Sequence, residues 1–293
     1  MDVTTGYSRA VTQFSKEEEH SIQLFFSCSP DNTKLLFRQN ITENHTWRAR
    51  LCSIRTAGED FKVLLEDFNN RTILTADVNW ERNLLLFKTT SPSGKYEVWK
   101  MDTEGSNPCF VRHIRWGSTW DGMQISPDGK TFAFRTNMGL RLMSFAERKT
   151  KKITCFGGEP SFSPDGQKIA FMNGEDELWT LDLSKLQIYK LLWDNEVVYP
   201  SWLTGRGNAR KPQWSPDGRL IQFSVTHTYR TPKSEYLKMV ELNKHHYKKM
   251  PTASKWRSLI KTGIVDVYDK KVWLLNDYSL TFAFSSTGGN EVF

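Results

Sequence analysis

A short segment that recurs along the chain limits its fold more than any other feature of the sequence. The segment reads as an apolar residue, Ser-Pro-Asp-Gly, two variable residues, an apolar residue, any residue and Phe. Three full copies, QISPDGKTFAF, SFSPDGQKIAF and QWSPDGRLIQF, end at Phe134, Phe171 and Phe223. FSCSPDNTKLLF ends at Phe37 with Asn32 in the glycine position, and two weaker copies end at Phe87 and Phe284. The pattern therefore indicates six repeats of one structural unit.

The residue types of the repeat are those of a tight turn between two strands. Proline presets the backbone for the second turn position, aspartate accepts hydrogen bonds from the backbone ahead, and glycine tolerates a positive φ. The flanking residues alternate or are continuously apolar, as in strands. Successive Phe positions lie 37 to 61 residues apart, which is close to the length of a propeller blade, about 40 to 50 residues. Each copy thus predicts a strand, a turn and a second strand.

Two further strand-like segments follow most copies. A third strand is expected at 47–54, 96–102, 140–145, 177–183 and 235–242. A fourth is expected at KVLLED (62–67), CFVRHI (109–114), KITCF (152–156), IYKLLW (188–193) and HYKKM (246–250). Four antiparallel strands in each repeat are typical of a propeller blade.

The pattern apolar-SPDG-x-x-I-A-F followed by L-W-x-L-D-L resembles the WD40-like repeat of TolB-type β-propellers, which also occurs in propellers of prolyl-oligopeptidase relatives and of oligogalacturonate lyases. It covers nearly the whole chain. The resemblance implies an all-β fold, a single six-bladed β-propeller over residues 1–293 with four-stranded antiparallel blades. It is almost uninformative about function, because these families share the blade and differ in what it carries.

The two ends of the chain suggest how the ring closes. The last copy has a first strand (VWLLN), a second strand (LTFAF) and the start of a third before the sequence stops. Near the other end, SRAVTQF (8–14) reads like the fourth strands. A propeller has unpaired strand edges unless one terminus completes the blade begun by the other. We therefore expect 9–14 to pair with 291–293 as the outermost strand of blade six, the alternative being a piece of a longer chain.

Composition bears on partners and location. The net charge of +7 favours acidic partners, but without a Lys/Arg run or a recognised motif no nucleic-acid partner is expected. No apolar run reaches the roughly 18 to 20 residues of a membrane span, and no signal peptide is visible. We expect a soluble monomer, cytoplasmic or a mature periplasmic or secreted form. The four cysteines have no C-x-x-C spacing, which argues against a zinc or redox motif.

The expected fold divides the molecule into two faces. The Ser-Pro-Asp-Gly turns lie on one, so their aspartates, Asp31, Asp128, Asp165 and Asp217, are expected to be structural. The longer, more varied loops lie on the other, where function is expected. The candidate ligand-binding residues there are Arg112, His113, Arg115, Trp116, Trp120, Asp121, Tyr199, Trp202, Arg206, Arg210, Lys211, His227, Tyr229 and Arg230. Arginine with aromatic rings suits anionic or ring-bearing ligands. The alternative is that these residues only pack the loops together.

Catalytic motifs are largely missing from the sequence. It has no G-x-S-x-G elbow and no H-E-x-x-H motif, and the histidines are scattered. We therefore expect a non-catalytic propeller that binds a protein or an acidic ligand, such as an acidic saccharide, on its loop face at the central channel, with no cofactor. Two alternatives stay open. One is an enzyme with polysaccharide lyase-like activity resembling oligogalacturonate lyase, in which a divalent metal assists and His113 and His227 take part. The other is a gating or regulatory propeller for a partner enzyme.

Overall fold

The structure is a computed structural model that describes residues 19–43, 46–66, 71–114, 122–173, 177–192, 207–230 and 256–274. These residues form five four-stranded antiparallel sheets. In these segments, no helix has the length and apolar character needed to cross a membrane.

Each sheet is one blade, numbered here in chain order. Blade 1 contains β1 (Glu19–Cys28), β2 (Lys34–Glu43), β3 (Thr46–Arg55) and β4 (Lys62–Glu66). Blade 2 contains β5 (Thr72–Asn79), β6 (Leu84–Thr90), β7 (Tyr96–Met101) and β8 (Cys109–Ile114). Blade 3 contains β9 (Met123–Ile125), β10 (Thr131–Thr136), β11 (Gly139–Ser144) and β12 (Thr150–Lys152). Blade 4 contains β13 (Gly158–Phe162), β14 (Lys168–Met172), β15 (Leu178–Asp182) and β16 (Gln187–Leu192). Blade 5 contains β17 (Gly207–Trp214), β18 (Leu220–Arg230), β19 (Trp256–Asp266) and β20 (Val272–Leu274).

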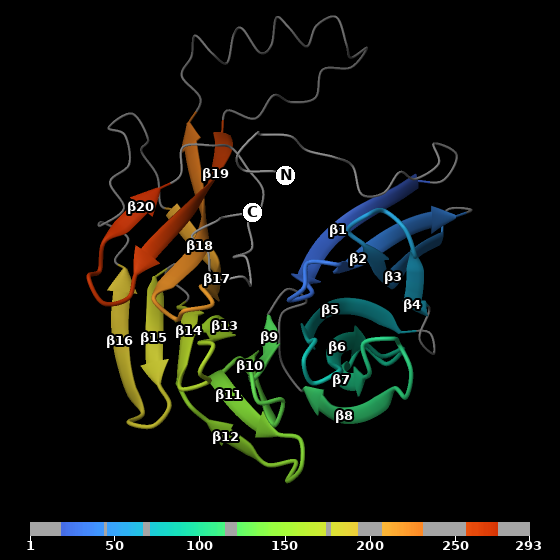
Figure 1. Ribbon diagram of the computed structural model, residues 1–293, viewed down its shortest axis with the longest axis horizontal. Coiled ribbons are helices and arrows are strands. Elements are labelled where there is room, and N and C mark those ends of the chain that lie inside the picture. Colours follow the sequence, from blue (N-terminus) through green and yellow to red (C-terminus); the bar gives the residue numbers. More distant parts are fainter. Residues whose placement is uncertain are drawn as a thin grey trace, which may run out of the picture.

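The blades follow one another around a common centre (Figure 1). In every blade the strands are paired in chain order, and the first strands β1, β5, β9, β13 and β17 lie nearest the centre. Consecutive inner strands contact each other, β1 with β5, β5 with β9, β9 with β13 and β13 with β17. The architecture is therefore a β-propeller with four-stranded antiparallel blades, as the repeat predicts.

Most of the predicted outer strands are confirmed. The third strands expected at 47–54, 96–102, 140–145 and 177–183 correspond to β3, β7, β11 and β15. The fourth strands expected at 62–67, 109–114 and 188–193 correspond to β4, β8 and β16. In blade 3 the fourth strand is short and lies slightly earlier than 152–156, at β12.

Blade 5 corrects the sequence-based assignment. Its third strand is β19, which pairs with β18 along its whole length from Leu220↔Asp266 to Arg230↔Trp256, and not the segment 235–242. The glycine at 263 explains why this register is favoured. A Cβ there would lie 2.4 Å from Cζ of Phe223, so only glycine leaves room for the ring. The VWLLN segment, expected to open blade six, instead supplies β20, the fourth strand of blade 5.

The remaining calls on blade six lie outside the described residues. They are the anchor Phe284 and the expected pairing of 9–14 with 291–293, which would close the ring.

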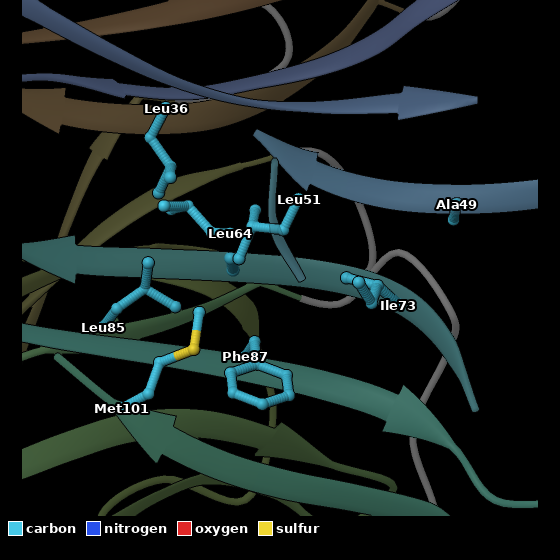
Figure 2. Close-up of a cluster of buried hydrophobic side chains, with 9 residues drawn as sticks. Leu36, Ala49, Leu51, Leu64, Ile73, Leu85, Phe87 and Met101 are labelled. Atoms are coloured by element: carbon cyan, nitrogen blue, oxygen red, sulfur yellow. The ribbon is translucent and has the colours of Figure 1, made fainter. Parts of the chain in front are cut away.

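The repeat phenylalanines of blades 2 to 5 form the core between blades, and Phe37 packs within blade 1 on Cys52 and Ile54. Phe87, Phe171 and Phe223 are fully buried, and Phe37 and Phe134 nearly so. Figure 2 shows one such cluster, in which Leu36 and Leu51 of blade 1 pack with Leu85 and Phe87 of blade 2. A blade thus buries its apolar side chains against its neighbours, and the hydrophobic effect holds the blades together.

Polar groups connect the inner strands across every described blade interface. Nε1 of Trp80 donates to Oγ of Ser27 (3.1 Å) between blades 1 and 2. Oδ2 of Asp77 accepts the backbone N–H of Ile125 (2.7 Å) between blades 2 and 3. Between blades 3 and 4, the side-chain oxygen of Gln124 accepts a hydrogen bond from the N–H of Phe162. Between blades 4 and 5, Nε1 of Trp214 donates to the carbonyl of Ser161 (2.9 Å). These bonds set the relative position of neighbouring blades while satisfying groups that packing would otherwise bury unpaired.

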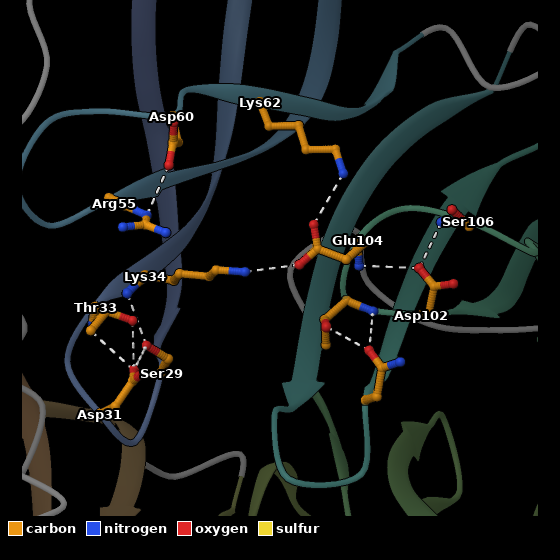
Figure 3. Close-up of polar contacts among 12 residues, drawn as sticks. Ser29, Asp31, Thr33, Lys34, Arg55, Asp60, Lys62, Asp102, Glu104 and Ser106 are labelled. Carbon is orange, nitrogen blue, oxygen red and sulfur yellow. Dashed lines mark hydrogen bonds and ion pairs between the residues drawn. The ribbon is translucent and has the colours of Figure 1, made fainter.

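The turn side adds ion pairs between blades. Figure 3 shows two lysines of blade 1 paired with Glu104 of blade 2. Nζ of Lys34 lies 2.8 Å from Oε1 and Nζ of Lys62 lies 3.1 Å from Oε2 of this carboxylate. The hydrogen bonds from these two lysines lower the pKa of Glu104 below its usual value. All three groups are about half exposed, so the contribution to stability is small.

Replacing Phe171 with alanine should lower the free energy of unfolding by roughly 3 to 5 kcal/mol, because it removes a fully buried ring from the interface of blades 3 and 4. Chemical denaturation monitored by tryptophan fluorescence measures this. The matched control is Phe61→Ala, whose ring is 43% exposed and which should cost less than about 1 kcal/mol. Equal losses in the two variants would contradict the assignment of the repeat Phe to the core.

Replacing Asp77 with asparagine should make stability less sensitive to pH. Burial raises the pKa of Asp77 to about 7 despite backbone hydrogen bonds from Ile125 and Val78. A carboxyl whose pKa is higher in the folded state stabilises fully below its unfolded pKa of about 3.9, and this stability is lost as pH rises through 7. Asparagine keeps an acceptor oxygen for Ile125 without the charge. Relative to the parent protein, Asp77→Asn should therefore gain stability between pH 5 and pH 8, by about 2 to 3 kcal/mol.

Urea denaturation of both proteins at the two pH values measures the difference. The exposed Asp60→Asn variant should show no such gain. An Asp77→Asn variant whose stability relative to the parent is the same at pH 5 and pH 8 would refute the burial of this carboxyl.

Candidate functional site

Contacts between connecting segments define the two faces of the propeller. The β1–β2 and β3–β4 turns of blade 1 touch, because Oγ1 of Thr56 donates to the carbonyl of Asn32 (2.8 Å). The turn carrying Glu104 of blade 2 lies beside them. The connections from second to third strands, and from each blade to the next, therefore lie at the opposite end. We call these the turn face and the loop face.

The repeat aspartates are used within their own turns. In blade 3, Oδ1 of Asp128 accepts the hydroxyl of Ser126 (2.6 Å) and the N–H of Lys130 (3.0 Å). Asp31, Asp165 and Asp217 accept the equivalent bonds. The hydrogen bonds from Ser29 and Thr33 lower the pKa of Asp31 to about 2. The structural role expected for these carboxylates is confirmed.

Seven of the predicted ligand-binding residues lie outside the part of the chain that the structure describes: Arg115, Trp116, Trp120, Asp121, Tyr199, Trp202 and Arg206. Five others belong to strands and not to loops: Arg210 and Lys211 to β17, and His227, Tyr229 and Arg230 to β18. The reason is that β17 and β18 continue their ladder toward the loop face as far as the pair Gly207↔His227, and β18 extends further against β19.

Arg112 lies in the outermost strand of blade 2, where it joins two blades. Its Nη1 donates to Oγ1 of Thr150, and its guanidinium lies 5.3 Å from the ring centroid of Phe134, both in blade 3. Burial, and then the nearby charge of Arg141, lower the pKa of Arg112. This arginine therefore stabilises the interface between blades 2 and 3 and is poorly placed to meet a ligand at the axis.

His113 belongs to a charged cluster at the loop-face end of blade 2. Its Nδ1 lies 3.7 Å from Oε1 of Glu97, and its ring packs on Phe110. Oε2 of Glu97 accepts Nε of Arg71 (2.6 Å) and Nε1 of Trp99 (3.2 Å). Burial would raise the pKa of Glu97, but the hydrogen bonds from Arg71 and Trp99 and the charge of Arg71 outweigh it and lower the pKa. The cluster leaves His113 as its exposed member, with 57% of its side chain accessible.

Blade 4 repeats this arrangement. Nε1 of Trp179 donates to Oε2 of Glu177 (3.1 Å), and Lys190 pairs with Oε1 of the same carboxylate while lying over the indole. The shared signal is Glu-x-Trp at the start of the third strand, in YEVW and DELW. Sequence analysis missed Arg71, Glu97 and Trp99 as a group because the arginine comes from a distant connection.

A cation follows the anchor phenylalanine in three consecutive blades: Arg38, Lys88 and Arg135. Each lies beyond the anchor toward the loop face. Arg38 is 5% exposed, and its Nη1 donates to the carbonyl of Leu74 in the next blade (3.1 Å). Lys88 is 4% exposed and lies over the ring of Tyr96. Arg135 is exposed and reaches Gly158 of the next blade. The loop-face half of blades 1 to 3 therefore carries a row of positive charge, which we call the cation row.

Within the described segments, no group of three or more His, Cys, Asp or Glu side chains could hold a metal ion.

Comparison with known proteins places the fold. No protein-family model matches the sequence, and no curated protein matches it. Among solved structures, the chain is similar to a protein described as a TolB from Agrobacterium tumefaciens, with a TM-score of 0.60 and 17% identity, covering 91% of this chain and 83% of the other. An oligogalacturonate lyase in complex with manganese matches with a TM-score of 0.52 and 14% identity over 76% of this chain and 66% of the lyase.

A puromycin hydrolase matches with a TM-score of 0.57 and 9% identity. The match covers 87% of this chain but 37% of the hydrolase. At these identities the similarity concerns the fold alone, since one propeller architecture serves many unrelated functions. The chain has a TolB-like β-propeller fold.

Proposed function

We propose that this chain is a non-catalytic binding propeller that holds a carboxylate-bearing ligand at the loop-face end of its axis. The observation that carries the proposal is the cation row of Arg38, Lys88 and Arg135. Three consecutive blades place a positive charge at the same repeat position on the loop-face side. Arg38 and Lys88 are buried and would act on an anion through the electrostatic potential of this face, whereas Arg135 is exposed and could contact the anion directly. Charges of one sign gathered on one face raise the local concentration of ligands of the opposite sign.

Two further features agree with an acidic ligand. The net charge is +7, so the protein as a whole attracts anions. The loop-face segment after His113 adds Arg115, Trp116 and Trp120 in sequence, and the segment before β17 adds Trp202 and Arg206. Arginine and tryptophan are the residues most often found as binding hot spots.

The ring in this proposal has six blades. Phe284 anchors the sixth, and the N-terminal strand at 9–14 completes it. Because β20 belongs to blade 5, the sixth blade must be built from the residues after 274 and those before 19. Closure by both termini surrounds the axis completely and leaves only the short outer edge of each blade unpaired.

Binding should depend on loop-face arginines. The probes are an oligogalacturonate and a poly-glutamate peptide, which present carboxylates on a saccharide and on a polypeptide. The double variant Arg115→Glu, Arg135→Glu, which includes the exposed member of the cation row, should bind the preferred probe at least about tenfold more weakly in titration calorimetry. Raising NaCl from 50 to 500 mM should weaken binding to the parent protein by roughly tenfold, because salt screens the attraction.

The matched control reverses two charges on the turn face. Lys130→Glu, Lys149→Glu changes the net charge by the same amount with exposed side chains and should bind normally. Arg219 is unsuitable as a control, because its Nε pairs with Asp266 at 2.7 Å. If the turn-face variant lost binding and the loop-face variant bound normally, the assignment of function to the loop face would be wrong.

The enzyme alternative has its own outcome in the same experiment. Release of an unsaturated uronate product from the oligogalacturonate on addition of Mn²⁺ would replace the binding proposal with a lyase. Binding of neither probe would refute the carboxylate ligand.

A further inference from the structure

A cavity of about 500 Å³ lies between blades 4 and 5, open on the turn-face side. On blade 4 it is bounded by Lys168 and Thr180 and by the turn that carries Lys185. On blade 5 it is bounded by the β19–β20 turn, with Tyr268 and Lys270. The volume lies in the range of small-molecule sites, about 300 to 1,000 Å³. This cavity is separate from the cation row, which lies toward the loop face in blades 1 to 3.

The packing of the two blades explains the opening. Nearer the axis, Ala170 and Leu178 of blade 4 pack on Phe223 and Val265 of blade 5 in one buried cluster. That contact ends at Val267, which is only partly buried. On the turn-face side of this contact the two sheets separate, and a wedge remains between them that is lined by Ile188 and Leu191 as well as by polar side chains.

The wedge carries an excess of positive charge. Lys168, Lys185 and Lys270 line it, together with a single carboxylate, Asp182. Oδ1 of Asp182 already accepts the N–H and the hydroxyl of Ser184 and the N–H of Lys185, and these hydrogen bonds lower its pKa. A fourth lining lysine, Lys190, pairs with Glu177 outside the cavity. The cavity therefore attracts anions.

Two tyrosine rings stand exposed at the same opening. Tyr268 is 68% exposed and Tyr189 is 49% exposed, values that are high for aromatic side chains. Nζ of Lys168 lies 5.5 Å from the centroid of the Tyr268 ring. Exposed rings of this size offer a flat surface on which a planar ligand can stack.

We infer that this cavity is a second binding site, for a compact oxyanion attached to a flat ring, in the class of nucleoside monophosphates. The residue types suit this chemistry. Lysine ammonium groups are compact point charges that bind phosphate, and exposed tyrosine rings stack on planar groups. All the cations that line the cavity are lysines. The lysines would hold the phosphate and Tyr268 would stack on the base. The inference does not depend on the function proposed for the loop face.

Titration of the full chain with AMP, inorganic phosphate and adenosine tests the site. AMP should bind more tightly than either fragment, because it uses the lysines and the ring together. Lys168→Met, Lys270→Met should weaken AMP binding at least tenfold. Tyr268→Ser should weaken AMP at least threefold and leave inorganic phosphate within twofold, a split that a loss of charge alone would not produce.

The control is Lys151→Met, Lys152→Met, which removes two exposed lysines from β12 of blade 3 and should leave AMP binding unchanged. Thermal melting checks that each variant is folded. No AMP binding at 10 mM would overturn the inference. So would equal losses in the cavity and control variants, which would show attraction to overall charge.

Discussion

The packing of each blade against the next is the interaction on which the rest of the structure depends. A single four-stranded sheet has two faces and cannot bury either alone. Phe87 of blade 2 is fully buried in a cluster that includes Leu36 and Leu51 of the preceding blade. The repeat therefore specifies packing of blade on blade: in blades 2 to 5 each copy contributes one phenylalanine to an interface shared with the preceding blade. Asp77 and Gln124 then fix the blades in register through backbone N–H groups of the next inner strand.

The same arrangement separates structural chemistry from the surfaces available for binding. The turn-face aspartates accept hydrogen bonds within their own turns, and Arg112 is bonded across the interface of blades 2 and 3. Positive charge also gathers in the cation row toward the loop face, where Arg135 is exposed, and in the lysine-lined wedge between blades 4 and 5. A propeller can carry both, because binding residues vary at blade ends without disturbing the shared core.

Local patterns in the sequence predicted most of the fold. They failed where the pairing of distant strands decides which segment joins a blade. The anchor phenylalanines and turn residues were readable because each acts within a few positions. The third strand of blade 5 was not, since 235–242 alternates as a strand does, whereas β19 is selected by its register with β18 and by the room that Gly263 leaves for Phe223. The cluster around Glu97 was also hidden, because Arg71 and His113 reach it from separate segments.

Closure of the blades into one ring is the central claim, and deletion of residues 1–14 tests it most directly. If the N-terminal strand completes the sixth blade, the deletion removes the outermost strand and exposes an edge. The account predicts that the melting temperature falls by roughly 10 °C or more, with a tendency to aggregate that the full chain lacks. A truncated protein that melts at the same temperature as the full chain and stays monomeric would contradict closure by the N-terminus.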